Sequence, residues 1–308
     1  DGGSLTGSTV TWSPNFGFAL AASRIPDERL AGVRLDGVRS FWNAAERIHF
    51  ETFEAFAERF EPYGLRPDAL RTNYGCAENI GGATFSVPEE PVPVETVDPE
   101  SLRERGVARE TSGSGGVTVV GVGRAAPGIA VRILSEGGRP LGDGEVGRLA
   151  LRTPSRMEEY LDDEDATREA IRDGWLVTAD LAYTRGEEVF WVGRVQERIV
   201  INARKYDPSD FERVLFEIEG LRPGCFVAFG TDDPEAGTQA LVIVSEVVDP
   251  GLVGDPDLVS TVRRRIFTEH GVRPRRVVLV PRGSLPKTSS GKRRHRHFKK
   301  RYLETDER

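Results

Sequence analysis

The sequence is poor in lysine, and this scarcity makes each lysine informative. Only five of its 42 basic residues are lysine, and none precedes residue 205. The five are Lys205, Lys287, Lys292, Lys299 and Lys300. Lysine is a mobile point charge and arginine a planar fork, so the two are not interchangeable. Each lysine is therefore a candidate for a specific role.

Cysteine and long apolar runs are also scarce. The two cysteines, Cys76 and Cys225, are far apart and form no C-x-x-C pair. This excludes a disulfide framework and a cysteine zinc site, and it favours a reducing compartment, so we expect a cytoplasmic protein. Apolar runs such as 240–244 are far too short to span a bilayer, so we expect no membrane span. The net charge of −7 argues against nucleic acid as a partner.

The length and the pattern along the chain favour two domains. A chain of 308 residues with 38% hydrophobic and 30% charged residues can bury a core in each. Strands and helices alternate differently after residues 193–197, so we predict an α/β chain that divides into 1–193 and 194–308. The second part has the pattern of a small α+β domain.

Local patterns predict individual elements. Residues 43–63 carry phenylalanines at helical spacing, and the glycine-punctuated stretch 71–86 reads as a loop. The proline-rich stretch 87–116 reads as an insertion or a mobile surface segment. In the second domain, Ser209 followed by Glu212 is a capping-box pattern that predicts a helix through residue 218. A basic helix is expected over 293–303.

Three stretches imitate binding motifs. GVGRAA (121–126) matches a loose dinucleotide fingerprint, but Pro127 and Gly128 follow where that motif needs a helix, so we interpret it as a loop. TSGSGG (111–116) lacks the lysine of a phosphate loop and reads as a flexible segment. The basic run 292–301 is better explained as a solvated helix face than as a nucleic-acid site.

Four stretches in order resemble motifs of the adenylate-forming superfamily, which contains acyl-CoA synthetases, peptide-synthetase adenylation domains and luciferase. They are YGCAE (74–78), GWLVTADLAY (174–183), GRVQERIVINARKYDPSDFE (193–212) and LPKTSSGK (285–292). Any one would be a weak signal, but four in the right order and spacing are a strong one.

Within that superfamily, the sequence is most similar to fatty acyl-AMP ligases. TWSPNFGFAL (11–20) resembles their Pro-Asn-Phe-Ala-Tyr segment, and NAAERI (43–48) lies where they carry Gly-Ala-Glu-Pro-Val. The stretch 87–116 lies where these ligases carry an insertion that typical CoA ligases lack. The resemblance implies that 1–193 is the carboxy-terminal part of a large AMP-binding domain, built of sheet and β-barrel subdomains. It implies that 194–308 is the mobile carboxy-terminal domain.

The activity implied by the resemblance is the ATP-dependent joining of a carboxylic acid, a fatty acid by this likeness, to AMP. The acyl group would then pass to the phosphopantetheine thiol of an acyl carrier protein. ATP and Mg²⁺ are the implied cofactors. The implied catalytic residues are Lys292, which would reach the carboxylate and the α-phosphate, Arg194, and Glu78, which would hold Mg²⁺.

The resemblance also implies binding residues. Tyr74 would stack on adenine opposite the 43–47 loop, and Asp180 would accept hydrogen bonds from the ribose. The implied nucleotide-binding residues are Tyr74, Gly75, Ala45, Glu46, Asp180 and Arg194. The implied substrate pocket consists of Asn15, Phe16 and Gly17, and Gln196 takes the hinge position.

Some features depart from the family pattern. The phosphate loop ending in Pro-Lys-Gly should precede all four motifs, yet no lysine does, so we expect the other half elsewhere in the same chain or in a partner chain. Ala179, Ala203 and Ala44 replace glycines of the family motifs. Two alternatives stay open: a non-catalytic half-ligase that binds a carrier protein or another partner, and an acyl-CoA ligase. If 87–116 selects the acceptor, deleting 88–115 should raise transfer to free CoA.

Overall fold

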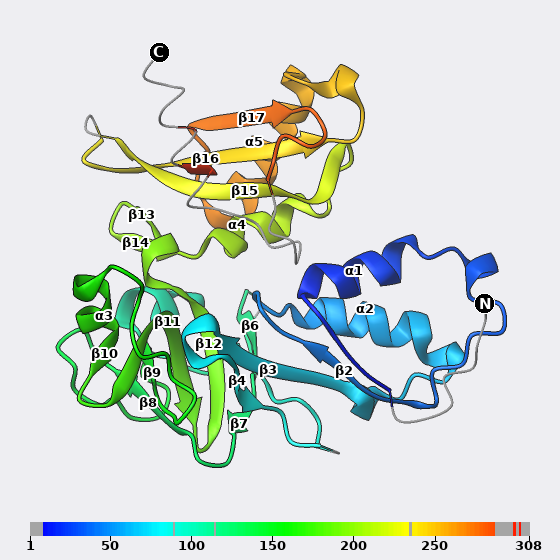
Figure 1. Ribbon diagram of the computed structural model, residues 1–308. Helices are drawn as coiled ribbons and strands as arrows, with labels where there is room; N and C mark the ends of the chain where they lie inside the picture. The colour runs from blue at the N-terminus through cyan, green and yellow to red at the C-terminus, as the bar shows by residue number, and fades with distance from the viewer. Residues whose placement is uncertain are drawn as a thin grey trace. The chain divides into compact units, whose positions relative to one another are not determined.

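The computed structural model describes residues 9–88, 90–113, 115–233 and 236–286, together with 298, 299 and 302. The chain divides into two compact units, residues 1–193 and residues 194–308 (Figure 1). The interpretation of these units as a partial AMP-binding domain and a mobile domain stays a prediction.

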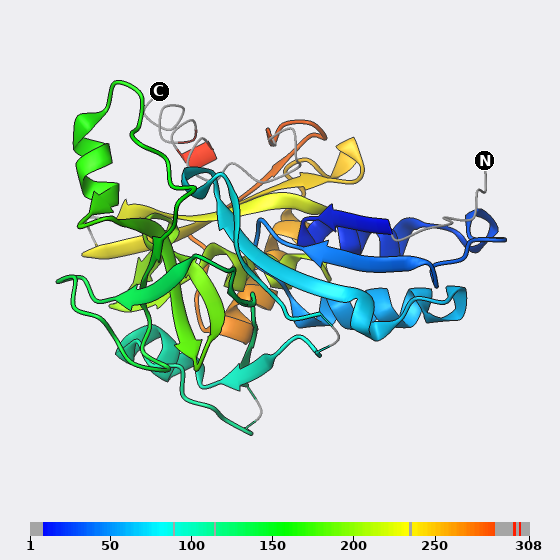
Figure 2. The same cartoon turned by 60° about the horizontal axis from the view of Figure 1, so that its bottom comes forward.

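A helix-covered mixed sheet forms the first part of unit one. Its order is β1-β2-β3-β4-β7, with the first three strands parallel and the last two antiparallel to their neighbours. The strands are β1 (Thr9–Ser13), β2 (Val38–Asn43), β3 (Leu70–Cys76), β4 (Gly81–Phe85) and β7 (Arg124–Ala125). Helices α1 (Asn15–Arg24) and α2 (Phe50–Phe60) lie side by side on one face of the parallel strands (Figures 1 and 2).

The phenylalanine spacing explains why α2 packs there. Phe53, Phe56 and Phe60 fall on one face of the helix and are buried. Phe18 of α1 meets Phe53 and Phe56 edge to face, with ring centroids 5.7 and 5.0 Å apart. The helix predicted within 43–63 is thus present, over the shorter range Phe50–Phe60.

The loop predicted over 71–86 is wrong, because this stretch contains most of β3 and all of β4. Its glycines allow two strands to approach closely rather than marking a turn. A Cβ placed on Gly75 would lie 2.1 Å from the carbonyl oxygen of Gly81. Likewise, a Cβ on Gly123, in the GVGRAA stretch, would lie 1.9 Å from the carbonyl carbon of Phe85. Among the described residues, no helix directly follows GVGRAA, as the interpretation against a dinucleotide motif requires, but the stretch is only partly a loop because Arg124 and Ala125 form strand β7.

An antiparallel sheet forms the second part of unit one. Its order is β10-β11-β9-β8, and β12 pairs with the other part of the long strand β11. The strands are β8 (Ala130–Leu134), β9 (Gly147–Arg152), β10 (Ile171–Arg172), β11 (Trp175–Arg185) and β12 (Glu188–Arg194), and α3 (Glu164–Ala170) precedes β10. The mixture of elements confirms the α/β class, while the β-barrel expected from the resemblance stays a prediction.

The stretch 87–116 is folded and is not a mobile surface segment in the parts described. It contains β5 (Val94–Val97), which pairs with β6 (Val117–Val120), and one π-helical turn at Ser101–Arg105. Val97 and Ala108 are buried against Tyr183 and Phe190 in a separate hydrophobic cluster. The alternative interpretation, an insertion, stays a prediction.

The second unit is a three-stranded sheet with helices on one face. Its strands are β15 (Leu221–Asp233), β16 (Thr238–Val247) and β17 (Arg276–Val280), and its helices are α4 (Pro208–Leu215) and α5 (Pro256–His270). The helices cover one hydrophobic face of the sheet. The other face is covered by residues that follow β17, namely Leu285, Phe298 and Tyr302.

The cap of α4 differs from the prediction. Asp207 is the N-cap residue, and it forms a capping box with Asp210, so the helix begins at Pro208 and ends at Leu215. Glu212 is buried, and its carboxylate accepts a hydrogen bond from the backbone N–H of Ala228. The basic helix predicted over 293–303 lies outside the described residues, apart from 298, 299 and 302.

One departure from the family motif, Ala203, lies in the turn of a two-residue β-hairpin. Strands β13 (Ile199–Ile201) and β14 (Arg204–Tyr206) are joined by Asn202 and Ala203, whose φ values are +50° and +64°. Such hairpins favour Asn-Gly, since positive φ is costly for a residue with a Cβ. The glycine of the family motif is replaced here by an alanine held in the left-handed region.

We therefore expect Ala203→Gly to stabilise the second unit by about 0.5–1 kcal/mol, because it removes this strain. The measurement is the free energy of unfolding in urea. Ala240→Gly is the matched control, since it removes the same methyl group from strand β16 and should destabilise by a similar amount. Destabilisation by both variants would contradict the strain argument.

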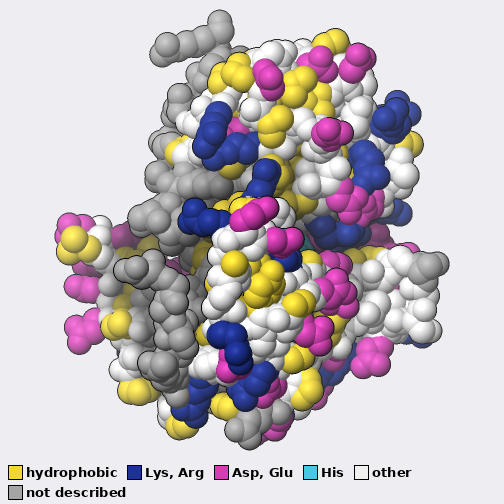
Figure 3. Space-filling view, turned by 90° about the vertical axis from the view of Figure 1, so that its right-hand side faces the viewer, with side chains coloured by type: hydrophobic (Ala, Val, Ile, Leu, Met, Phe, Trp, Pro, Cys, Tyr) yellow, Lys and Arg dark blue, Asp and Glu magenta, His cyan; other side chains and the backbone are white. Residues whose placement is uncertain are grey.

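The exposed surface carries charged side chains of both signs, as expected from a sequence with 30% charged residues (Figure 3). Acidic and basic side chains are interspersed over the face shown in Figure 3. Among the described residues, no helix combines the length and the apolar character needed to cross a membrane.

Candidate functional site

Most predicted site residues of unit one lie at or just after the carboxyl ends of three neighbouring strands, β1, β2 and β3, whereas Asp180 lies within β11 of the antiparallel sheet. In the sheet, Ser13 at the end of β1 lies beside Asn43 at the end of β2, and Asn43 lies beside Thr72 in β3. The segments that continue from these ends carry the residues singled out in the sequence. In open α/β sheets, ligands bind at this edge.

The structure joins two motifs through a buried hydrogen bond. The hydroxyl of Tyr74 donates to Oδ2 of Asp180 over 2.7 Å, and Nε1 of Trp191 donates to Oδ1 over 3.1 Å. Asp180 is 4% exposed. The pairing of β11 with β9 shifts between Val177 and Leu181, and this irregularity includes Asp180. Tyr74 and Asp180 were predicted as parts of one site, and the structure brings them together.

Burial sets the protonation of this cluster. It raises the pKa of Tyr74 well above its ordinary value, and the nearby carboxylate of Asp180 raises it further. The phenol therefore stays a hydrogen-bond donor at any physiological pH. Burial, with Glu78 nearby, raises the pKa of Cys76 to about 11. This cysteine is thus a thiol rather than a thiolate at neutral pH.

Glu78 lies in a short 3₁₀ turn just after β3. Its Oε1 accepts a hydrogen bond from the hydroxyl of Tyr160 over 2.8 Å, and its carbonyl accepts one from the N–H of Met157. Among the described residues, no three His, Cys, Asp or Glu side chains are grouped so as to hold a metal. A half-buried single carboxylate fits Mg²⁺, which takes its other ligands from phosphates and water.

The first turn of α1 is tied to the loop after β2. The N–H of Phe16 donates to Oε1 of Glu46 over 2.7 Å, which satisfies one of the open donors at the helix start. Oδ1 of Asn15 accepts hydrogen bonds from Nδ2 of Asn43 and from the N–H of His49. Asn15 is buried and holds these two segments together. That Asn15, Phe16 and Gly17 line a substrate pocket stays a prediction.

Two more predicted site residues, Ala45 and Gly17, lie where the backbone geometry is constrained. Ala45 has a φ of +77°, so the loop around it turns through a conformation that favours glycine. A Cβ on Gly17 would lie 2.0 Å from Oγ of Ser13, so this glycine leaves room for the serine side chain. Any contact of these two residues with a ligand stays a prediction.

The remaining predicted residues belong to the second unit. Arg194 and Gln196 are exposed, and Gln196 lies in a 3₁₀ turn (Val195–Glu197). Lys292, the implied catalytic cation, lies outside the described residues.

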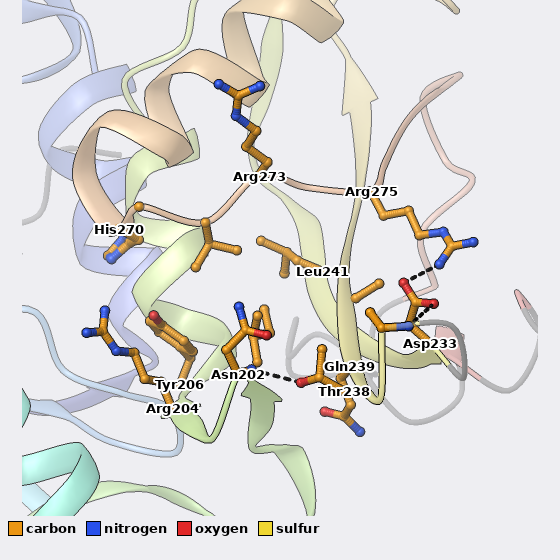
Figure 4. A pocket seen from close by; sticks show the side chains of 15 residues that line it. Asn202, Arg204, Tyr206, Asp233, Thr238, Gln239, Leu241, His270, Arg273 and Arg275 are labelled. Carbon is orange, nitrogen blue, oxygen red and sulfur yellow. Dashed lines mark hydrogen bonds and ion pairs between the residues drawn. The ribbon is translucent and has the colours of Figure 1, made fainter.

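The second unit also holds a cavity of about 550 Å³ (Figure 4). Arginine and histidine side chains lie around it, but several of them are engaged by protein groups. Arg275 pairs with Asp233, the guanidinium of Arg273 lies 4.7 Å from the ring centroid of Phe267, and Nε2 of His270 donates to the carbonyl of Asp210. Because these three side chains are engaged within the protein, the cavity does not define a ligand.

Sequence reasoning missed Trp191, Tyr160 and Asn43, which contact Asp180, Glu78 and Asn15 respectively. Trp191 lies in β12, the strand that follows the GWLVTADLAY strand β11, and alternation along β12 could have drawn attention to it. Tyr160 is distant in sequence from Glu78, and nothing in its own neighbourhood indicates the contact.

The chain is similar to several known proteins in sequence and in structure. No family model matches the chain. It is 34% identical over 313 residues to the long-chain-fatty-acid–AMP ligase FadD26 of Mycobacterium marinum, covering 94% of this chain and 52% of that protein. It is 31% identical to the 4-hydroxyphenylalkanoate adenylyltransferase of Mycobacterium tuberculosis, covering 96% and 50%.

Solved structures agree. At 29% identity and a TM-score of 0.88, the chain superposes on a structure from a study of fatty acyl-adenylate ligases of E. coli and L. pneumophila, covering 96% of this chain and 53% of that one. At 26% identity and 0.81, it superposes on McyG A-PCP complexed with phenylalanyl-adenylate, covering 96% and 50%. The chain spans about half the length of the curated relatives it matches.

Proposed function

Because this chain belongs to the adenylate-forming superfamily, we propose that it carries part of the machinery of an ATP-dependent fatty acyl-AMP ligase. The observation that carries the proposal is the buried hydrogen bond between Tyr74, near the carboxyl end of β3, and Asp180 of β11. It joins two motifs that the resemblance assigns to one nucleotide. The acceptor of the activated acyl group would be the phosphopantetheine thiol of an acyl carrier protein.

In the first half-reaction, a carboxylate oxygen attacks the α-phosphorus of ATP and the bond to pyrophosphate breaks. Two anions approach each other, so catalysis depends on positioning and on cations near the phosphate. Lys292 would supply a mobile cation, and Arg194 a second. Mg²⁺, held by Glu78 and the phosphates, would neutralise charge on the leaving pyrophosphate.

The described residues would mainly bind and orient the nucleotide. Tyr74, fixed through its hydroxyl, would present its ring to adenine opposite the 43–47 loop. Asp180 would accept hydrogen bonds from the ribose with lone pairs that Tyr74 and Trp191 leave available. Gln196 would lie at the hinge between an adenylating and a transferring arrangement of the second unit.

The test is fatty-acid-dependent exchange of radioactive pyrophosphate into ATP, using the protein purified at its native length from its source. Intact mass and a search for co-purifying chains establish which polypeptides are present. Exchange, followed by transfer to a carrier protein, is the expected result. Exchange with transfer to free CoA would favour the acyl-CoA ligase, and carrier binding without exchange the non-catalytic half-ligase; either result contradicts the proposal.

In that enzyme, Lys292→Ala should lower the exchange rate at least about a hundredfold, because the developing negative charge loses its mobile cation. Lys299→Ala is the matched control and should leave the rate within about twofold, because Lys299 lies outside the lysine motif. Unchanged exchange in Lys292→Ala would remove the lysine from the proposed mechanism.

A further inference from the structure

The segment that resembles the terminal lysine motif begins at an ion pair in which the carboxylate is buried and the arginine is half-buried. Glu246, near the end of β16, is 1% exposed. Its Oε2 lies 2.6 Å from Nη1 of Arg222, and its Oε1 accepts a hydrogen bond from the backbone N–H of Leu285 over 2.8 Å. Leu285 is the first residue of the LPKTSSGK stretch.

The fold explains how these three residues meet. Glu246 alternates with Val242 and Val244 along β16, so its side chain lies on the sheet face opposite the helices. Glu246 also pairs with Val280, the last residue of β17. The turn at 281–284 then brings the chain back across that face.

Arg222 reaches Glu246 because of an irregularity in β15. The pairing of β15 with β16 shifts between Leu221 and Phe226, so extra residues oppose Glu246. Such bulges redirect side chains, and this one allows the guanidinium to approach the buried carboxylate.

The lysine segment is held on the same sheet face at its other end. The ring of Tyr302 meets the ring of Phe229 with centroids 5.4 Å apart, and the guanidinium of Arg276 lies 5.2 Å from the centroid of Tyr302. Phe298 also packs on this hydrophobic cluster. Described residues on both sides of the Lys292 segment, Leu285 before it and Phe298 and Tyr302 after it, therefore pack on one face of the sheet.

The carboxylate stays charged despite its burial. Burial alone would raise the pKa of Glu246, but hydrogen bonds from the N–H groups of Leu285 and Gly283 and from Arg222 together hold it below its ordinary value. A buried charge is maintained only when its partners are in place, so this cluster specifies one conformation of the chain entering the motif.

We propose that Glu246 and Arg222 are positioning residues that fix the start of the 285–292 segment and thereby orient Lys292 during adenylation. This inference rests on the proposed function, because it concerns the step in which that lysine acts. Neither residue contacts the reacting atoms in this account; they act through the backbone of the motif.

Adenylation requires a cation at a defined place near the reacting atoms, so it depends on how the chain enters the lysine motif. We therefore expect loss of the anchor at Leu285 to slow adenylation about tenfold.

The test compares two half-reactions in the native-length enzyme. Glu246→Ala should slow pyrophosphate exchange about tenfold but leave transfer from supplied acyl-adenylate to the carrier thiol within about twofold. Glu246→Gln should recover most of the exchange, because its side-chain oxygen can still accept the N–H of Leu285. Glu212→Ala is the matched control: Glu212 is also 1% exposed and also accepts a backbone N–H, but that N–H belongs to Ala228. It should not change the ratio of the two rates.

A second readout does not depend on activity. Hydrogen exchange at the amide of Leu285 should be at least about tenfold faster in Glu246→Ala than in the wild type, with the amide of Val244 unchanged. Equal loss of both half-reactions, or unchanged exchange at Leu285, would overturn the inference while leaving the proposed function intact. A wild-type enzyme that forms no adenylate would instead overturn the proposed function.

Discussion

Deleting residues 88–115 is expected to unfold the first unit rather than to change the acceptor of the acyl group. The deletion removes β5 and the turn after it, and with them Val97 and Ala108, which are fully buried or nearly so. It leaves Tyr183 and Phe190 exposed, although both are buried in the intact protein. Each large side chain exposed in this way costs about 1.5–3 kcal/mol.

Polar contacts add to this loss. Oε2 of Glu95 accepts a hydrogen bond from the hydroxyl of Tyr183, and its Oε1 accepts one from Nε of Arg185. Removing the glutamate leaves those donors without their acceptor, at about 1–3 kcal/mol for a buried group. The sum exceeds about 5 kcal/mol, which is comparable to the entire stability of a typical domain.

Denaturant unfolding and the yield of soluble protein measure the effect. The matched control removes only residues 112–115, of which Ser112, Gly113 and Gly115 are exposed. It should cost less than about 1 kcal/mol, because loop closure depends weakly on length. If the longer deletion unfolds cooperatively within about 1 kcal/mol of the wild type, the packing argument is wrong. Whether 87–116 limits transfer of the acyl group to free CoA should therefore be tested by substituting exposed residues of this stretch, for example Arg109→Glu.

The sequence was most informative where a residue type has one dominant use. The phenylalanine spacing located α2, and four short motifs located the family and brought Tyr74 and Asp180 into one site. The sequence was least informative where one local pattern is compatible with two different structures. The glycines of 71–86 suggested a loop, but Gly75 is required because Gly81 of the neighbouring strand approaches its backbone closely.

Contacts between distant segments were beyond local reasoning. The prolines of 87–116 suggested a mobile surface, and only the packing of Val97 against residues of β11 and β12 shows a folded element. The same holds for Glu246, which reads as an ordinary strand residue until the return of the chain at Leu285 gives it a partner. These contacts join residues that are far apart in the sequence, so no local sequence pattern predicts them.

Replacing Asp180 by alanine should destabilise the first unit by about 2–5 kcal/mol. The hydroxyl of Tyr74 and Nε1 of Trp191 both lose their acceptor, and each buried donor left unsatisfied costs about 1–3 kcal/mol. Asp180→Asn should cost about 1 kcal/mol, because the amide can still accept from Trp191 and the tyrosine hydroxyl can rotate to accept from the amide. Urea unfolding followed by tryptophan fluorescence measures both.

Asp143→Ala is the matched control. Asp143 also accepts two hydrogen bonds, from Thr184 and from the N–H of Gly186, but it is exposed, so water replaces the lost acceptor. We expect a cost below about 1 kcal/mol. Equal losses in Asp143→Ala and Asp180→Ala would contradict the view that burial makes the Tyr74–Asp180 contact important.

A double-mutant cycle separates this structural role from the proposed role in binding ATP. Tyr74→Phe keeps the ring that would stack on adenine and removes only the hydroxyl, so it should couple with Asp180→Asn by about 0.5–3 kcal/mol in stability. In the proposed ligase, Tyr74→Phe should raise the KM for ATP a few-fold, because the ring is less firmly held. Asp180→Ala should lower kcat/KM for ATP about a hundredfold, since it removes the proposed ribose acceptor as well. If Asp180→Asn, which remains folded, binds ATP as tightly as the wild type, the carboxylate serves the fold alone.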